Sequence, residues 1–192
     1  MCDMMGLERG EKQGVHTDDI IKVLHGNLKD GYQFSASPVY EDEPDYYNES
    51  PTLDDRVHCL VSVVSANTVT LLDDSVVHKI KTIRLKASNL GIPQVVVLTH
   101  VDQACPHVID KLENVYRSRK IKEKMEVCSN RLGVPMTCIF PVKNYHEEVE
   151  LEGMVDTLLL HSFKQIVTLG NNYISTLTDI KMENDYKGTG ER

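Results

Sequence analysis

The same helix-to-strand corner occurs twice in this 192-residue sequence, and it constrains the fold more than any other feature. The stretches NLGIPQVVVLT and RLGVPMTCIFP both place Leu-Gly, a β-branched residue and Pro before an apolar run. Gly91 and Gly133 supply the left-handed residue that ends a helix, and Pro93 and Pro135 prevent its continuation. Each corner therefore predicts a helix that is followed by a buried strand.

From residue 58 onward, apolar runs alternate with segments of helical periodicity. We expect strands at 58–66, 94–100 and 136–142. We expect helices at roughly 75–90, 109–125 and 151–170. Buried strands that alternate with helices indicate a parallel sheet covered on both faces. The prediction is a three-layer α/β fold whose strand C-terminal ends share one ligand-binding edge.

The chain divides into three predicted parts. Residues 1–57 hold a DMMGLE loop, a short helix at 18–26 with Asp18 or Asp19 near its N-cap, and a flexible acidic loop. That loop is either a solvated excursion or a regulatory, partner-binding segment. Residues 58–170 form three β-α units, and residues 171–192 form a polar C-terminal extension that we expect to be mobile.

Composition excludes several classes of function. The formal net charge of −8 offers no footprint for nucleic acid or an anionic membrane. No apolar run approaches the ~20 residues of a membrane span. The five cysteines are scattered without a CxxC pair, which argues against a disulfide framework and a cysteine zinc site. Reduced thiols in a cytoplasmic protein are the simplest interpretation.

Three short motifs fall on the expected ligand-binding edge, and each suits a guanine-nucleotide site. A DxxG loop, here with Asp3 and Gly6, places a carboxylate beside the Mg²⁺ shell and a glycine amide against a phosphate. A THVD loop, with Thr99 and Asp102, points a carboxylate at the two donors of the guanine edge, which adenine lacks.

The third motif is PVKNY, where the backbone amides of a small residue and a Lys meet the guanine oxygen. Its residues are Val142, Lys143 and Asn144. Taken singly, each motif is also an ordinary turn or strand end. Together, in this order, they match the third, fourth and fifth motifs of small GTPases.

Longer segments resemble one family. DMMGLE, SPTLDDRVHCLV, LGIPQVVVLTHVDQACP, NVYRSRKIKEKM and IFPVKNYHEE are similar to the interferon-induced protein 44 family, from residue 1 to about 170. The resemblance implies a C-terminal GTPase-like domain of a cytoplasmic protein induced in antiviral immunity. By resemblance, Asp3, Gly6, Thr99, Asp102, Val142, Lys143 and Asn144 form the nucleotide site, with Asp3 acting indirectly on Mg²⁺.

Two departures from the GTPase pattern bear on mechanism. No GxxxxGK followed by Ser or Thr occurs, so the amide nest and lysine of a P-loop are missing. Relative to the family, we expect the chain to begin at its third GTPase motif and to lack the P-loop half of a Ras-like fold. His100 stands where the base-reading loop normally has Lys; it is either a loop residue without a role or a cause of weakened guanine affinity.

We therefore expect a degenerate, GTPase-like protein of the interferon-induced immune response that binds GTP or GDP with Mg²⁺ weakly, or has lost them. Phosphoryl transfer depends on the missing positioning groups, so we do not expect GTP hydrolysis. The alternative is a scaffold or protein-interaction module that binds no nucleotide and has an unknown protein partner. A missing neighbour for the strand at 58–66 would leave an open sheet edge, which favours self-association or marginal folding.

Overall fold

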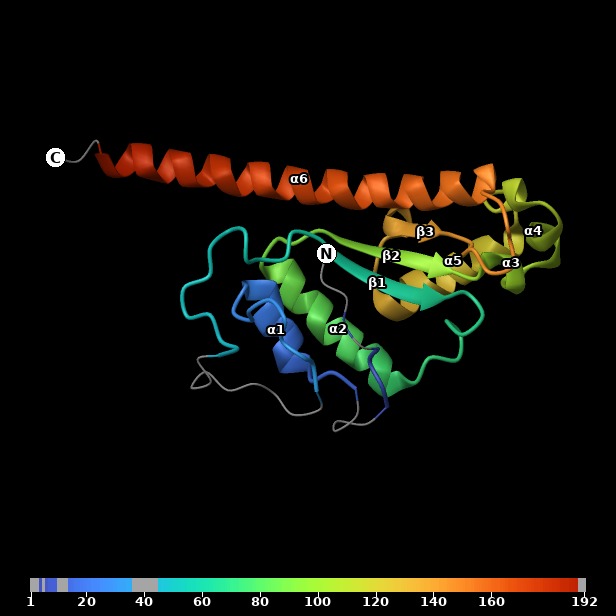
Figure 1. Ribbon diagram of the computed structural model, residues 1–192, viewed down its shortest axis with the longest axis horizontal. Helices are drawn as coiled ribbons and strands as arrows, with labels where there is room; N and C mark the ends of the chain where they lie inside the picture. Colours follow the sequence, from blue (N-terminus) through green and yellow to red (C-terminus); the bar gives the residue numbers. More distant parts are fainter. Residues whose placement is uncertain (1–3, 5, 10–13, 36–44, 190–192) are drawn as a thin grey trace.

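Helices and strands alternate through most of the chain in the computed structural model, which describes residues 4, 6–9, 14–35 and 45–189, with side chains to residue 182 (Figure 1). In chain order the elements are α1 (Thr17–His25), β1 (Leu60–Ser65), α2 (Asp74–Asn89), β2 (Gln94–Thr99), α3 (Val101–Ala104), α4 (Pro106–Asp110), η1 (Leu112–Asn114), α5 (Arg119–Leu132), η2 (Met136–Cys138), β3 (Ile139–Pro141) and α6 (Gly153–Thr189).

The three strands form one parallel sheet in the order β1-β2-β3. In the central strand, Leu98 pairs with Val64 on one side and with Pro141 on the other. The β2 residues Val95, Val96 and Leu98 are buried, which is why its sequence is a continuous apolar run. The prediction of an α/β fold with a parallel sheet is confirmed.

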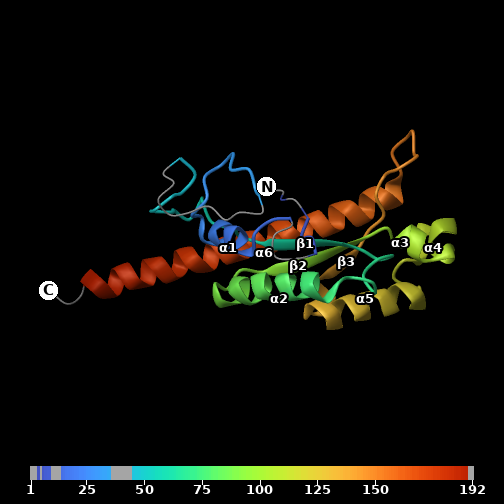
Figure 2. The ribbon, with the colours of Figure 1, turned by 90° about the horizontal axis from the view of Figure 1, so that it is seen from below.

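Helices lie on both sides of this sheet (Figures 1 and 2). α2 and α5 lie on one side, and the long α6 runs across the other. α6 is anchored near its start by a ring contact between His161 and Phe140, and further along by Tyr173, whose hydroxyl donates to the Leu90 carbonyl at 2.9 Å. α1 packs against α2, where Ile20 and Leu24 join the same apolar cluster as residues of that helix.

Both predicted corners are confirmed. Gly91 and Gly133 adopt left-handed conformations with φ of 70° and 75°. The residues that follow them, Ile92 and Val134, are buried. Because only glycine adopts this conformation without strain, each corner turns the chain from the end of α2 or α5 toward the next strand.

The predicted helix at 109–125 is wrong in its extent, because three separate elements, α4, η1 and α5, share this stretch. α4 begins at Pro106, which cannot donate a backbone hydrogen bond to a preceding helix. α5 begins only after Ser118, whose hydroxyl accepts from the Ile121 amide at 3.3 Å. The strand predicted at 136–142 is shorter too, since 136–138 form a turn of 3₁₀ helix.

The ends of two other helices also differ from expectation. His16, rather than Asp18 or Asp19, caps α1, and its ring nitrogen accepts from the Asp18 amide at 3.3 Å. Asp19 is instead fully buried and accepts from the Tyr32 hydroxyl at 2.8 Å. α6 continues past Gly170 to residue 189. Gly170 is buried beside His58 within the helix and does not end it.

None of the helices in the described ranges is both long enough and apolar enough to span a bilayer.

Candidate functional site

The loop after β2 carries the predicted base-reading residues. Thr99 ends the strand and is buried, and its hydroxyl lies 3.4 Å from the Val64 carbonyl and 2.9 Å from Nδ1 of His100. His100 adopts φ of 57°, and no other non-glycine residue of the described chain has a positive φ. A left-handed conformation costs a non-glycine residue roughly 1–2 kcal/mol. The turn therefore holds strain just before α3, where Asp102 lies in the first turn.

The loop after β3 lies directly beside the loop after β2. The Val142 amide donates to the Leu98 carbonyl at 2.8 Å, and the Val101 amide lies 3.5 Å from the Val142 carbonyl. These bonds extend the β2–β3 pairing beyond the strands. They bring Lys143 close enough to Asp102 for the two charges to interact.

Asp102 is half-buried, and no described residue forms a hydrogen bond or ion pair with its carboxylate oxygens. Its backbone carbonyl, by contrast, accepts from the Cys105 amide at 3.3 Å and so closes the turn of α3. A carboxylate with unused acceptor capacity at a strand end fits the role of reading a base with two adjacent donors.

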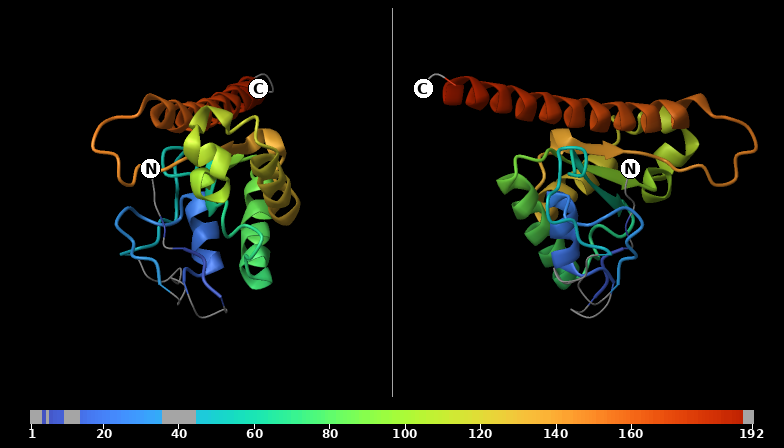
Figure 3. Two further views of the ribbon diagram at one scale, coloured as in Figure 1. Left: turned by 90° about the vertical axis from the view of Figure 1, so that its right-hand side faces the viewer. Right: turned by 60° about the vertical axis from the view of Figure 1, so that its left-hand side comes forward.

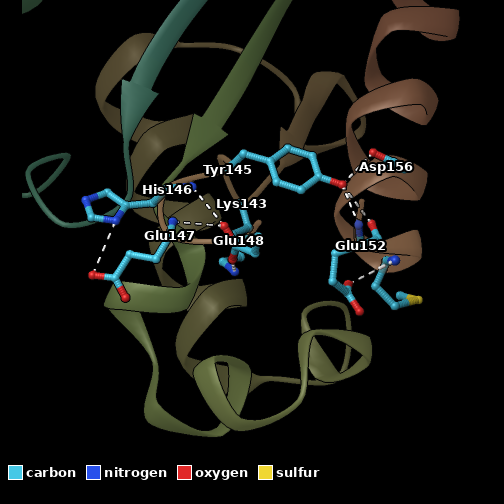
Figure 4. Close-up of polar contacts among 8 residues, drawn as sticks. Lys143, Tyr145, His146, Glu147, Glu148, Glu152 and Asp156 are labelled. Atoms are coloured by element: carbon cyan, nitrogen blue, oxygen red, sulfur yellow. Dashed lines mark hydrogen bonds and ion pairs between the residues drawn. The ribbon is translucent and has the colours of Figure 1, made fainter. Parts of the chain in front are cut away.

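Lys143 is already engaged by the loop that it begins. Its ammonium forms an ion pair with Glu148, and the hydrogen bond that it donates to Glu148 is the main reason that its pKa is raised (Figure 4). The negative charges of Asp102 and Glu152 raise the pKa of Lys143 further. Asn144, the next predicted residue, is exposed.

Glu148 is held by the backbone of its own loop. Its Oε2 accepts from the amides of His146 at 2.8 Å and Glu147 at 3.2 Å. The bond from His146, followed by the one from Lys143, lowers the pKa of Glu148 to about 2. The loop between β3 and α6 that these contacts brace stands out from the body of the molecule (Figure 3).

Tyr145 ties this loop to the start of α6. Its hydroxyl donates to Asp156 at 2.8 Å and accepts from the Glu152 amide at 2.7 Å (Figure 4). Neither Glu148 nor Tyr145 was among the site residues predicted from the sequence. α6 begins only at Gly153, so Glu148 lies in the loop. The available signal for this ion pair was a lysine that is closely followed by a run of acidic residues.

The DxxG loop is not described completely. Asp3 lies outside the described residues, so its predicted role toward Mg²⁺ stays a prediction. Gly6 is exposed and lines a cavity of about 430 Å³ beside β1, together with Met4 and Leu7. Within the described ranges, no group of three or more His, Cys, Asp or Glu side chains is arranged to hold a metal ion.

The depressed pKa of Glu148 makes its ion pair testable by titration. The pKa of this carboxyl is lower in the folded chain than in the unfolded chain, so its ionised form stabilises the fold at pH values above the usual pKa of 4.5. This contribution is lost as the pH falls toward about 2. We expect nuclear magnetic resonance to show Glu148 ionised at pH 4. Lys143→Met should raise the Glu148 pKa without restoring it fully, because the His146 amide remains.

Lys86→Met, on the far helix α2, is the matched control and should leave the Glu148 titration unchanged. A midpoint close to 4.5 in the unmodified protein would contradict the assigned contacts.

The chain is 34% identical over 178 residues to interferon-induced protein 44 of Mus musculus, an alignment that covers 92% of this chain and 42% of the relative. It is 32% identical over 177 residues to interferon-induced protein 44-like of Homo sapiens, an alignment that covers 92% of this chain and 39% of that relative. It is also 32% identical to the human interferon-induced protein 44, an alignment that covers 92% of this chain and 40% of that relative.

The chain thus spans about two fifths of the length of these curated relatives. A scan against models of protein families finds no match. A search of solved structures likewise finds none.

Proposed function

Because the chain belongs to the interferon-induced protein 44 family, we propose that it is a cytoplasmic protein of the interferon-induced antiviral response that engages a guanine base weakly through Asp102. GTP hydrolysis is not part of this proposal, since the sequence contains no GxxxxGK motif to position a triphosphate.

The observation that carries the proposal is the pairing of the two loops after β2 and β3. They are joined through the Val142 amide, which donates to the Leu98 carbonyl at 2.8 Å. This bond joins the loop of Asp102, whose carboxylate has unused acceptor capacity, to the loop of Lys143, and the two charges interact. A guanine edge offers a ring N–H and an exocyclic amine to such a carboxylate, whereas adenine would leave it unpaired.

Two features of the same site limit its affinity. His100 provides no long aliphatic stem along the base, which a lysine at this position would supply. Lys143 is paired with Glu148, so a ligand that uses the ammonium must displace a carboxylate. When bound, Mg²⁺ would neutralise phosphate charge, and Asp3 is the residue that resemblance assigns to it.

The test is a thermal melt followed by far-ultraviolet circular dichroism, with GDP, GTP or ATP and Mg²⁺. A ligand at about 100 times its dissociation constant adds roughly 2.7 kcal/mol, which for a chain of this size is a shift of several degrees. We expect GDP and GTP to raise the melting temperature and ATP to leave it unchanged. Asp102→Ala should abolish the shift.

Asp110→Ala is the matched control, because Asp110 is an exposed carboxylate at the end of α4. It should retain the guanine-specific shift. Equal shifts with ATP, or a shift that survives Asp102→Ala, would overturn the proposal.

A scaffold that binds no nucleotide is the second candidate, and His100 favours it. Histidine has no long aliphatic stem to pack along a base, where the base-reading loop normally has lysine. A cooperative melt that no nucleotide moves would select this candidate. Analytical ultracentrifugation of the same sample tests the expected self-association.

A further inference from the structure

The connection between β2 and β3 forms a second cavity, of about 570 Å³. Its lining residues all lie between Cys105 and Lys120, in α4, in η1 and at the start of α5. This part of the molecule lies at the opposite end from α1 (Figures 1 and 2). Every residue from 105 to 120 belongs to the described chain, so all the walls of this cavity are present.

Positively charged side chains line this cavity, and none of its lining residues carries a carboxylate. The cations are Arg117, Arg119 and Lys120, and the imidazole of His107 lies in the same wall. The Asn114 side-chain amide donates to the His107 carbonyl at 3.3 Å and so ties α4 to η1. The cavity thus gathers positive charge in a chain whose formal net charge is −8.

Two of the three cations have no partner within the described chain. Arg119 pairs with Glu123 at 3.3 Å. The side chains of Arg117 and Lys120 form neither a hydrogen bond nor an ion pair with any described residue. The first turn of α5 contains no acidic residue, so the helix dipole adds to the positive potential there. Like charges around one cavity repel each other, and a bound anion would relieve that repulsion.

The thiol of Cys105 responds to this positive potential. Its side chain is only 2% exposed, and burial by itself would raise its pKa. The pKa of Cys105 is nevertheless lowered, because hydrogen bonds with the Ser118 hydroxyl and with the amides of His107 and Val108 oppose the effect of burial. The positive charge of Lys120 lowers it further. The groups at this wall therefore favour a negative charge.

We propose that this cavity binds a compact, soluble molecule that carries several phosphate groups. The Arg117 guanidinium can donate two parallel hydrogen bonds to one phosphate, and the Lys120 ammonium supplies a point charge for another. The cavity volume falls within the roughly 300–1,000 Å³ of small-molecule sites, which is more room than a single phosphate needs. The proposal does not involve Asp102 and stands whether or not the chain binds a guanine base.

An extended polyanion or a membrane surface fits this part of the molecule less well. The exposed carboxylates of Asp110, Glu113 and Glu123 lie on the same three elements as the cations. A nucleic acid or an anionic bilayer that covered these elements would meet the carboxylates as well. A small ligand within the cavity needs to contact only the positive groups.

The test is isothermal titration calorimetry of the full chain with inositol hexakisphosphate, in the absence of Mg²⁺ and nucleotide. We expect saturable binding of this probe. Inositol hexasulfate has the same ring but only one charge on each group, and it should bind at least tenfold more weakly. Bound hexakisphosphate should also raise the pKa of Cys105, measured through its Cβ resonance, because the anion opposes the charge of Lys120.

Two double variants locate the binding site. Arg117→Gln combined with Lys120→Gln should weaken hexakisphosphate binding at least tenfold. Lys81→Gln combined with Lys86→Gln removes the same charge from exposed positions of α2, and should stay within about threefold of the unmodified protein. If the first variant fails to fold, the two inositol probes and the Cys105 titration decide the question on the unmodified chain.

Four results would overturn the proposal. The first is no saturable binding up to about 1 mM hexakisphosphate, the limit of weak specific binding. The second is an equal loss of affinity in the two double variants, which would indicate unspecific charge attraction. The third is equal binding of the hexasulfate. The fourth is capture of the chain by phosphatidylcholine vesicles that contain phosphatidylinositol bisphosphate, if free hexakisphosphate does not compete, because the ligand would then be a membrane lipid.

Discussion

Leu98→Ala should lower the free energy of unfolding by about 3–4 kcal/mol, the largest effect that we expect from one substitution. Leu98 is fully buried at the centre of the middle strand, where its neighbours in the sheet are Val64 and Pro141. Neighbours on both sides hinder collapse of the cavity left by the lost side chain, so both the transfer and the cavity penalties apply. Urea denaturation monitored by circular dichroism measures the change.

Leu85→Ala is the matched control, since it deletes the same atoms from a leucine that is 66% exposed on α2. We expect Leu85→Ala to change the free energy of unfolding by less than about 0.5 kcal/mol. A loss at Leu98 no larger than at Leu85 would mean that β2 is not the centre of the core.

Arg131→Met should destabilise the chain by about 2–3 kcal/mol through loss of hydrogen bonds rather than loss of packing. The Arg131 guanidinium, near the end of α5, donates to the carbonyls of Val69 at 3.3 Å, Thr70 at 2.8 Å and Leu72 at 2.6 Å, and also pairs with Asp74 at 2.9 Å. It thereby anchors the turn that joins β1 to α2. Methionine preserves the aliphatic stem but leaves these acceptors without a donor.

Added salt distinguishes the stabilisation from the carbonyl hydrogen bonds of Arg131 from the stabilisation by its ion pair. Asp74 is fully exposed, so 1 M NaCl should screen that pair while leaving most of the destabilisation in place. The matched control is Arg119→Met at the start of α5, whose partner Glu123 is also exposed, with an expected change below about 0.5 kcal/mol. Equal effects at the two arginines would show that the carbonyl contacts are not made in solution.

The local elements were predictable where the chain itself contains their cause. Gly91 and Gly133 have the conformation that the repeated corner requires, and the apolar run at 94–99 is the central strand. The break before α5 was missed, because helical spacing of Ile109 and Tyr116 masked the signals of Pro106 and Ser118. The extent of α6 was missed as well, because Gly170 resembles a helix end in sequence but packs against His58 in the fold.

The candidate site was predictable in its location and not in its contacts. The rule that parallel strands end on one edge places Thr99 and Val142 near each other, and the structure brings their loops together. Gly6, predicted for the same site by resemblance, lines the cavity beside β1, and its role toward a phosphate stays a prediction. The Lys143–Glu148 pair depends on where α6 begins, which the spacing of apolar residues does not reveal.

The sequence alone therefore determined the class of the fold, the two corners and the edge of the sheet that carries the polar loops, because each follows from backbone preference or from a local pattern of burial. Tertiary structure decided which charges pair across the loop after β3, which acceptors Arg131 satisfies, and that β1 borders an apolar cavity. These features join residues far apart in the chain, or depend on a helix boundary, and no local pattern encodes how such groups meet.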